Sequence, residues 1–230
     1  MTDSTQTFDG VIARLRATFQ GPLPGLEVCM EMAPQNPRHL RVEAAREKGC
    51  REGAVLILLY PYENDIYTLL TVRSSTLRTH SGQISLPGGR IDSGESATET
   101  ALRETHEELG IPPATISIVG ALTQVYIPPS NYCLAPLVGF MNVRPEIRPN
   151  PDEVAAVIEL PARHLVGAAN RVVEDWMIEG EPRKIPYFLF NEYKIWGATA
   201  IILSEFAALW DKVLREENGE GSVESGETTK

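Results

Sequence analysis

The stretch Gly89-Arg-Ile-Asp-Ser-Gly-Glu-Ser-Ala-Thr-Glu-Thr-Ala-Leu-Arg-Glu-Thr-His-Glu-Glu-Leu-Gly-Ile111 carries the strongest structural signal in this chain. Ser96 followed three residues later by Glu99 has the spacing of a capping box, which predicts that a helix begins after Ser96. Gly110 predicts its end, because glycine takes the left-handed conformation most easily. The residues between them supply one apolar face for burial: Ala101, Leu102, Thr105 and Leu109.

Three carboxylates of this predicted helix occupy positions that are electrostatically unfavourable. Glu104, Glu107 and Glu108 are spaced i, i+3 and i+4, so they lie on one side of the helix and repel one another. They also occupy the last turn, where the helix dipole disfavours negative charge. A divalent cation such as Mg²⁺ or Mn²⁺ would reverse both costs, because these ions prefer oxygen ligands. The alternative is an ordinary solvated acidic face.

The full spacing separates these alternatives. After Gly89 come five residues, Glu95, seven residues, Arg103-Glu104, two residues, Glu107-Glu108, one residue, and Gly110-Ile111. This pattern resembles the Nudix box of hydrolases that act on nucleoside diphosphates linked to another group. One position departs from the pattern, because Thr105 stands where a large aliphatic residue is usual, and we expect only a change in packing there.

The resemblance implies a fold and a set of roles. The fold is an α/β/α sandwich with a mixed sheet between helices, and the activity is that of a pyrophosphatase. Metal ligation falls to Glu104, Glu107 and Glu108, with the Gly88 carbonyl as a further ligand. Glu95 and Arg103 are expected to pair and to brace the loop against the helix.

A second motif precedes the box. The segment Leu69-Leu-Thr-Val-Arg-Ser-Ser-Thr-Leu-Arg-Thr-His-Ser-Gly-Gln-Ile-Ser-Leu-Pro-Gly-Gly89 is similar to the additional motif of the coenzyme A pyrophosphatase branch of Nudix proteins. Leu86 replaces a phenylalanine, which we interpret as a packing substitution. The segment Ile195-Trp-Gly-Ala-Thr-Ala200 is similar to the one that opens the last helix in that branch.

The upstream motif contains cationic and titratable side chains. Arg73, Arg78 and His80 precede the predicted metal loop, and arginine suits bidentate contact with phosphate oxygens. We therefore predict that these three residues bind substrate. The alternatives are that the arginines pair with acidic surface residues and that His80 makes a structural hydrogen bond.

One carboxylate must act as the base toward water or orient it, and in Nudix proteins this base can come from outside the box. Glu153, in Pro151-Asp-Glu-Val154, is our candidate for such an outside carboxylate. The alternative is a surface residue at the entry to a strand.

Composition limits the partners of the chain. It has 230 residues, 43% of them hydrophobic, which is enough for a buried core, and a net charge of −10. This negative charge argues against a sequence-independent nucleic-acid binder, which needs a basic surface. No apolar run has the length of a membrane span. The expected partner is a small nucleotide of the coenzyme A type, and a homodimer stays open.

The order of apolar segments predicts three regions. Residues 1–53 form an amphipathic helix over 8–19 and an extended segment packed on the main domain, residues 54–215 form the Nudix domain, and 216–230 form a disordered acidic tail. Within 26–52 we expect either a solvated surface or a source of positive charge near an anionic substrate, from Arg38, Arg41, Arg46, Lys48 and Arg51. Strands are expected at 54–60, 66–72, 115–125, 133–141 and 154–160, a late hairpin over 172–190, and a closing helix over 198–214.

Cys29, Cys50 and Cys133 are odd in number and widely spaced, so we expect neither a disulfide framework nor a zinc site. Free thiols fit a reducing compartment, and the first residues lack the features of a signal peptide. The cytoplasm is the expected location.

These inferences together predict Mg²⁺- or Mn²⁺-dependent hydrolysis of coenzyme A or its derivatives to 3′-phosphoadenosine 5′-phosphate and 4′-phosphopantetheine. One alternative is a Nudix pyrophosphatase for ADP-ribose or another nucleoside diphosphate derivative, which Pro128 and Pro129 favour by their position after the box. A second is a Nudix-fold protein that binds a nucleotide without cleaving it.

Overall fold

The computed structural model describes residues 4–34, 41–74, 82–178 and 180–217. Arg38, Arg78, His80 and most of the predicted tail lie outside the described residues. No helix in these ranges is long and apolar enough to cross a membrane.

The main sheet has eight strands, with the path β3-β2-β1-β7-β5; β4 pairs with β1, β6 with β7 and β8 with β2. β1 and β7 run parallel, and the other pairs are antiparallel, so the sheet is mixed. The strands are β1 (Arg51–Tyr62), β2 (Asp65–Arg73), β3 (Ile84–Ser85), β4 (Gly88–Arg90), β5 (Ser117–Ala121), β6 (Val125–Ile127), β7 (Tyr132–Phe140) and β8 (Val154–Pro161).

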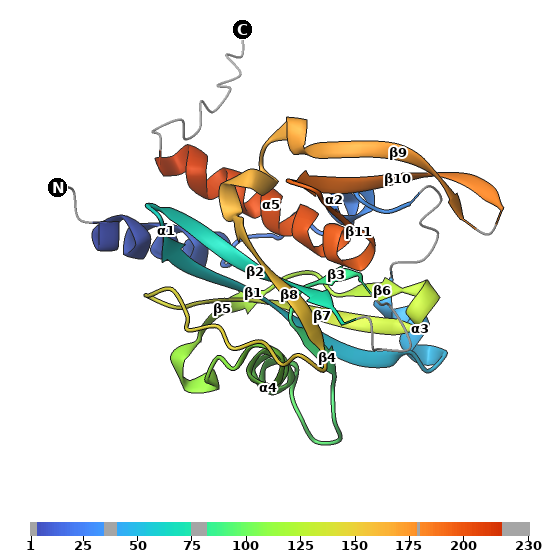
Figure 1. Ribbon diagram of the computed structural model, residues 1–230, viewed down its shortest axis with the longest axis horizontal. Helices are drawn as coiled ribbons and strands as arrows, with labels where there is room; N and C mark the ends of the chain where they lie inside the picture. Colours follow the sequence, from blue (N-terminus) through green and yellow to red (C-terminus); the bar gives the residue numbers. More distant parts are fainter. Residues whose placement is uncertain (1–3, 35–40, 75–81, 179, 218–230) are drawn as a thin grey trace, which may run out of the picture.

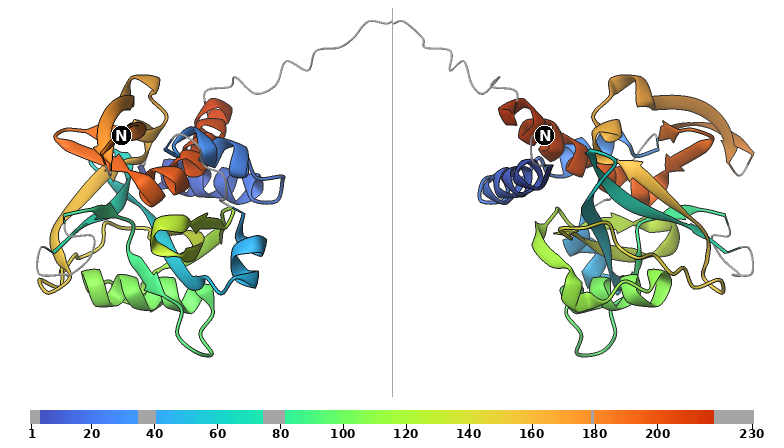
Figure 2. Two further views of the ribbon diagram at one scale, coloured as in Figure 1. Left: turned by 90° about the vertical axis from the view of Figure 1, so that its right-hand side faces the viewer. Right: turned by 60° about the vertical axis from the view of Figure 1, so that its left-hand side comes forward.

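Helices cover both faces of this sheet (Figures 1 and 2). α4 (Ala97–Leu109) lies on one face, where it packs on Leu56 and Leu58 of β1. α1 (Ser4–Thr18) and α5 (Gly197–Glu217) lie on the other face, against Ile57 and Leu59. Alternate residues of β1 enter two separate cores, which explains why its centre is continuously apolar. The predicted α/β architecture with a mixed sheet between helices is confirmed.

A second, three-stranded sheet packs on α5. It has the order β11-β10-β9 and is antiparallel throughout. The late hairpin expected from the sequence is β9 (Arg171–Ile178) with β10 (Glu181–Phe190), while β11 (Tyr193–Trp196) was not predicted. The described residues also form four short 3₁₀ turns: Pro113–Thr115, Pro128–Ser130, Ala162–Leu165 and Ala168–Asn170.

The segment 26–52 is more ordered than a solvated surface. α2 (Leu26–Glu31) and α3 (Val42–Glu47) lie within it. Several of its apolar residues are buried, namely Cys29 and Met32 near α5 and Val42 and Ala45 near Cys133, although Met30 is exposed. Sequence reasoning missed these helices because each has only six residues, too few to show an apolar period.

The cysteine prediction is wrong. Cys50 and Cys133, 83 residues apart, form a disulfide, while Cys29 is a buried free thiol. The cause is the parallel pairing of β1 with β7, which sets Glu52 opposite Cys133 and so brings Cys50 beside it. Spacing along the chain does not show such a contact. The argument for a reducing compartment loses its basis here, because it assumed free thiols.

Candidate active site

The helix that carries the carboxylates has the predicted ends. The Ser96 hydroxyl accepts a bond from the Glu99 amide at 3.2 Å, and the Glu99 carboxylate accepts one from the Ser96 amide at 2.8 Å, which completes the capping box. Gly110 is left-handed, with φ 70°, and ends α4. Thr105 is buried, and its hydroxyl donates to the Ala101 carbonyl at 2.7 Å, so the departure from the Nudix pattern leaves no unpaired polar group.

Arg103 organises the site. Its Nε and Nη2 donate to the two oxygens of Glu95 at 2.8 and 3.0 Å, which confirms the predicted pair. Nη2 also donates to the Arg90 carbonyl at 3.1 Å, so the helix is fastened to β4 as well as to the loop. Thr100 donates to Glu95 at 2.6 Å. The bonds from Arg103 and Thr100 lower the pKa of Glu95 to about 2, which keeps it charged.

Glu104 and Glu107 share one nitrogen of the same arginine. Arg103 Nη1 donates to Glu104 Oε1 at 2.9 Å and to Glu107 Oε2 at 3.0 Å. Glu104 is the more enclosed of the two, with a side-chain exposure of 16% against 48% for Glu107. Burial raises the pKa of Glu104, although its bond to Arg103 opposes that shift.

Glu108 is the most enclosed of the three carboxylates, at 3% exposure. Its pKa is raised to about 8, first by burial and then by the charges of Glu104 and Glu153; the charge of Arg73 and the Gly88 amide act in the opposite direction. Its Oε2 is buried with no hydrogen-bond partner among the described residues. A buried, unpaired carboxylate oxygen needs an explanation that a folded core does not provide.

Glu153 lies at this site, as its charge on both Glu104 and Glu108 shows. The loop before it is tied to the end of α4, where the Asn150 amide donates to the Glu108 carbonyl at 2.9 Å. The Ser74 amide donates to the Glu153 carbonyl at 2.8 Å. The structure thus brings the outside carboxylate beside the box carboxylates; whether it acts as the base stays a prediction.

Arg73 ends β2 at a β-bulge opposite Val154 and contributes positive charge at Glu108. Of the three predicted substrate-binding residues, it is the one that lies among the described residues. Thr100 and Asn150 were missed by sequence reasoning. A threonine on the inner face of the helix, five residues after Glu95, was the available signal for Thr100.

Two glycines permit the close approach of β4 to its neighbours. Gly88 has φ 151°, and a Cβ there would lie 2.3 Å from the Ala54 carbonyl oxygen. A Cβ on Gly89 would lie 2.3 Å from Glu104 Oε1. The contact at Gly88 is with backbone atoms and excludes any side chain, whereas a side chain at Gly89 would displace the Glu104 carboxylate from its place beside β4.

The residues fit a divalent cation in their chemistry. All the predicted side-chain ligands are carboxylate oxygens, as Mg²⁺ and Mn²⁺ prefer, and Glu108 Oε2 is a buried oxygen with no partner among residues 4–34, 41–74, 82–178 and 180–217. The carboxylates do not converge within 4.8 Å as a group of three; in the described ranges only Cys50, Glu52 and Cys133 do so. Arg103 accounts for this spacing, because its Nη1 binds both Glu104 and Glu107.

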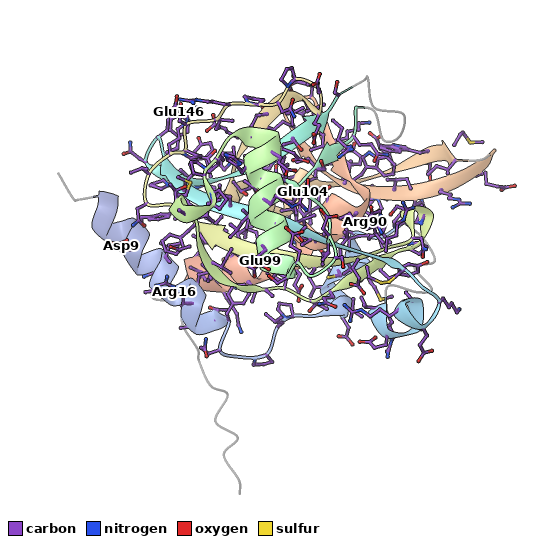
Figure 3. The ribbon with its side chains drawn as sticks, turned by 90° about the horizontal axis from the view of Figure 1, so that it is seen from below. Asp9, Arg16, Arg90, Glu99, Glu104 and Glu146 are labelled. Carbon is purple, nitrogen blue, oxygen red and sulfur yellow. A yellow bond between two sulfur atoms is a disulfide. The ribbon has the colours of Figure 1, made fainter. Side chains whose placement is uncertain are left out.

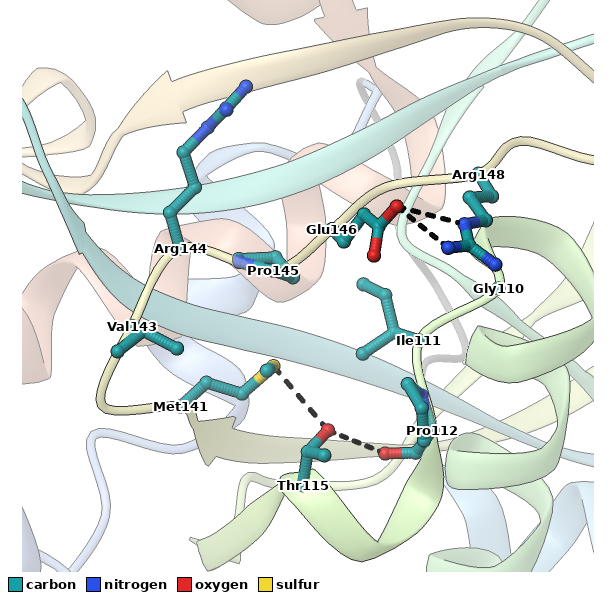
Figure 4. A pocket seen from close by; sticks show the side chains of 10 residues that line it. All are labelled: Gly110, Ile111, Pro112, Thr115, Met141, Val143, Arg144, Pro145, Glu146 and Arg148. Carbon is teal, nitrogen blue, oxygen red and sulfur yellow. Dashed lines mark hydrogen bonds and ion pairs between the residues drawn. The ribbon is translucent and has the colours of Figure 1, made fainter.

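Figure 3 shows α4 from below, with Glu104 near Arg90 and with Glu99 at the beginning of the helix. A cavity of about 430 Å³ lies beyond the other end of α4 and is lined by Ile111, Met141 and Arg144, among others (Figure 4). None of the predicted site residues lines it. We therefore place the candidate site at the carboxylates.

Comparison with known proteins agrees with this geometry. The NUDIX domain model matches residues 51–176, which contain β1, the upstream motif, α4 and Glu153. The chain belongs to the Nudix hydrolase family. The prediction of an enzyme of this family is thereby confirmed.

The relatives of this Nudix protein include plant and bacterial proteins. It is 37% identical over 169 residues to "Nudix hydrolase 22, chloroplastic" of Arabidopsis thaliana, covering 69% of this chain and 55% of that protein. It is 36% identical over 170 residues to the Nudix hydrolase NudL of Escherichia coli K12, covering 73% of this chain and 88% of that protein. The chain thus matches just over half the length of the plant relative.

Among solved structures, the chain is similar to a Nudix hydrolase from M. smegmatis, with a TM-score of 0.46 and 19% identity. The match covers 75% of this chain and 88% of that one. At this level of similarity we draw nothing from it about the site.

Proposed function

We propose that this Nudix protein hydrolyses the diphosphate bond of coenzyme A or a derivative of it. The observation that carries the proposal is the meeting of the two sequence motifs: Arg73, from the motif similar to the coenzyme A pyrophosphatase branch, lies near enough to Glu108 of the box for its charge to oppose the rise in the pKa of that carboxyl. An arginine at this place suits a phosphate oxygen of the substrate. Leu86 of the same motif is buried at 3% exposure in the core with α5, which agrees with a packing role.

Each side chain of the site has a distinct part in this proposal. Glu104, Glu107 and Glu108, with the Gly88 carbonyl, would hold Mg²⁺ or Mn²⁺, and such an ion neutralises the charge of a diphosphate. Glu95 and Arg103 fix the loop and β4 against α4 through the bonds described above. Arg73 orients a phosphate group.

Glu153 is our candidate for the base. Its carboxylate is close enough to influence Glu104 and Glu108, and its backbone is held by Ser74 and Asn150. It would accept a proton from the attacking water as the new phosphorus–oxygen bond forms and the bridging bond of the diphosphate breaks. The products are 3′-phosphoadenosine 5′-phosphate and 4′-phosphopantetheine.

Incubation of the purified protein with coenzyme A and Mg²⁺ or Mn²⁺, followed by separation of the products, tests the proposal. We expect both products in equal amounts. Cleavage of ADP-ribose without consumption of coenzyme A would overturn the proposal of coenzyme A as the substrate, but not the proposal of diphosphate hydrolysis. Binding of coenzyme A without turnover under any of these conditions would favour the non-catalytic alternative.

The ADP-ribose alternative receives no support from Pro128 and Pro129. Both lie at the start of a 3₁₀ turn whose end, Asn131, is left-handed and donates its amide to the Pro128 carbonyl at 3.1 Å. A tight turn between β6 and β7 explains the two prolines without a ligand.

A further inference from the structure

Two arginines lie on the face of the main sheet opposite α4, at the edge where β4 pairs with β1. In the register of the strands, Arg90 of β4 stands opposite Gly53 of β1, and Gly53 stands opposite Leu134 of β7. Two residues earlier in β1, Arg51 stands opposite Tyr132. Residues at i and i±2 share a face of a strand, so Arg51, Arg90 and Tyr132 emerge on the same side.

Gly89 and Val125 identify this side. Gly89, next to Arg90 in β4, faces Glu104 of α4, so Arg90 must point away from α4. Val125 stands opposite Leu134 and is buried in the core shared with α1 and α5. Arg51 and Arg90 therefore belong to the α5 side of the sheet, while the box carboxylates belong to the α4 side.

Arg51 is held in place. Its guanidinium lies over the ring of Tyr132, 4.9 Å from the centroid, and Nη2 donates to the Ser130 carbonyl at 2.9 Å. The remaining donors of this planar group stay available, because the side chain is exposed.

Arg90 is held only by its backbone. Its carbonyl accepts from Arg103 Nη2 and its strand pairs with Gly53, yet its exposed guanidinium has no ion pair or hydrogen bond with any described residue. The nearest carboxylate along the chain, Asp92, is turned to Arg103 at 4.0 Å. An arginine whose backbone is fixed beside Arg103, and whose guanidinium has no partner among the described residues, can bind an anion.

The backbone positions of the two arginines allow their side chains to reach one anion. Diagonal neighbours on adjacent antiparallel strands are about 7–8 Å apart at their Cα atoms, within the reach of arginine side chains. Gly53 between them has no side chain, and a Cβ there would lie 3.1 Å from Tyr132 Cδ1 and 3.0 Å from Leu134 Cδ2. The Tyr132 ring thus lies over Gly53, which stands opposite Arg90, and the Arg51 guanidinium lies over the same ring.

We propose that Arg51 and Arg90 form a subsite for a second phosphate of the substrate, a phosphomonoester carried on its ribose. The inference rests on the proposed function, since it assigns a place to a phosphate other than the diphosphate. The diphosphate belongs beside Glu104, Glu107 and Glu108 on the α4 side. Arg90 stands one residue beyond Gly89 and points to the other side, so it reaches a group attached to the same nucleotide but outside the scissile bond. A phosphomonoester of charge near −2 is the anion that two arginines suit best.

The test measures binding and not cleavage. The dissociation constants of adenosine 3′,5′-bisphosphate and of AMP are measured by calorimetry without added divalent cation, and their ratio is compared between variants. Repulsion of the 5′-phosphate by the box carboxylates is common to both ligands and cancels in the ratio. We expect the wild-type protein to bind the bisphosphate about 10-fold or more tightly, the size expected for charge-assisted hydrogen bonds. In R90A and in R51A/R90A this ratio should fall to about twofold or less.

Arg215→Ala is the matched control. It also removes one exposed arginine, but from the last turn of α5, where Arg215 pairs with Asp211. Its ratio should equal that of the wild type. R90A removes a side chain that makes no hydrogen bond or ion pair with the described part of the chain, so its melting temperature should be nearly unchanged. A fall in the ratio of dissociation constants can then not be ascribed to unfolding.

The outcomes separate the two proposals. A wild-type ratio near one, or a ratio that survives in R51A/R90A, overturns the subsite even if coenzyme A is cleaved. If the preference for adenosine 3′,5′-bisphosphate over AMP is lost in R90A, the subsite is supported even if coenzyme A is not the molecule that the enzyme cleaves.

Discussion

Two glutamates are buried on helices of this protein, and their surroundings differ. Glu205 of α5 is 1% exposed and accepts three bonds from nitrogen and oxygen donors: from the Gly25 amide at 2.9 Å, the Thr123 amide at 2.9 Å and the Thr123 hydroxyl at 2.6 Å. Glu108 of α4 is 3% exposed, and its Oε2 has no hydrogen-bond partner in the part of the chain that the structure describes. A buried charge with all its bonds made holds a structure together, whereas one with a bond missing indicates a ligand.

Glu108→Gln should produce the largest effect that follows from this comparison. The substitution keeps the volume but removes the charge needed at the diphosphate site, so we expect activity to fall about 100-fold. The melting temperature should change little at neutral pH, because a carboxyl group with a pKa of about 8 is mostly protonated there and its Oε2 makes no hydrogen bond with a described residue. Activity assays with thermal unfolding check both. Retention of more than about a tenth of the activity would remove Glu108 from the cation site.

Glu205→Gln should show the opposite pattern. The glutamine NH₂ group would take the place of one carboxylate oxygen of Glu205. The Gly25 or Thr123 group that donates to that oxygen would then be a buried donor without an acceptor. We expect a loss of about 2–4 kcal/mol in the free energy of unfolding, as for breaking charged hydrogen bonds in a core. Activity per folded molecule at low temperature should stay within about twofold of the wild type.

Denaturant unfolding measures the loss, and Glu216→Gln is its control. Glu216 lies on the same helix but is exposed. Equal stability of the two variants would show that the bonds of Glu205 contribute nothing to the attachment of residues 25 and 123 to α5.

Glu174 extends the comparison to a carboxylate that is bonded without being buried. It accepts from Lys194 Nζ at 2.5 Å, Tyr187 Oη at 2.6 Å and Trp176 Nε1 at 2.9 Å, and these bonds lower its pKa from 4.5 to about 2. A lowered pKa favours the folded state above the unfolded pKa. This contribution is therefore present at pH 5 and lost as the pH falls from about 4.5 to 2.

The stability difference between wild type and Glu174→Gln should consequently shrink between pH 5 and pH 3. Urea unfolding at several pH values measures it. The difference at pH 5 should be small, because the group is exposed and screened. A difference that grows toward low pH would contradict the assigned direction.

The sequence predicted the ends of α4 correctly and missed features set by distant contacts. The single strand expected over 115–125 was wrong, because the chain forms two strands there, β5 and β6. The capping box at Ser96, the stop at Gly110 and the pair Glu95–Arg103 all follow from spacing within one segment, and the structure has them. The same reasoning noted the charge conflict of Glu104, Glu107 and Glu108. It also suggested Glu153, although only the loop tied to the end of α4 explains its position.

Three features could not have been read from the sequence, for physical reasons. The Cys50–Cys133 disulfide depends on the register of strands far apart in the chain. So does the placement of Arg90 and Val125 on the same face of the main sheet. The difference between Glu205 and Glu108 depends on which amides the folded chain brings to each oxygen. On a helical pattern, Glu205 looks like any glutamate beside apolar residues.

Cys29 gives the smallest effect and the finest test of the comparison. Burial, and after it the charge of Glu205, raises the pKa of its thiol to about 12, and Sγ lies 4.0 Å from Glu205 Oε2. Alkylation requires the thiolate, so at pH 8 Cys29 in the native protein should react far more slowly than in urea. Cys50 and Cys133 should not react until a reductant is added, which intact mass after labelling will show.

Glu205→Gln removes a negative charge and loosens the contact with Gly25, so it should speed the labelling of Cys29, while Glu108→Gln should leave it unchanged. Equal rates in the two variants would mean that Glu205 does not hold the segment containing Cys29, and the contrast between the two buried glutamates would then rest on Glu108 alone.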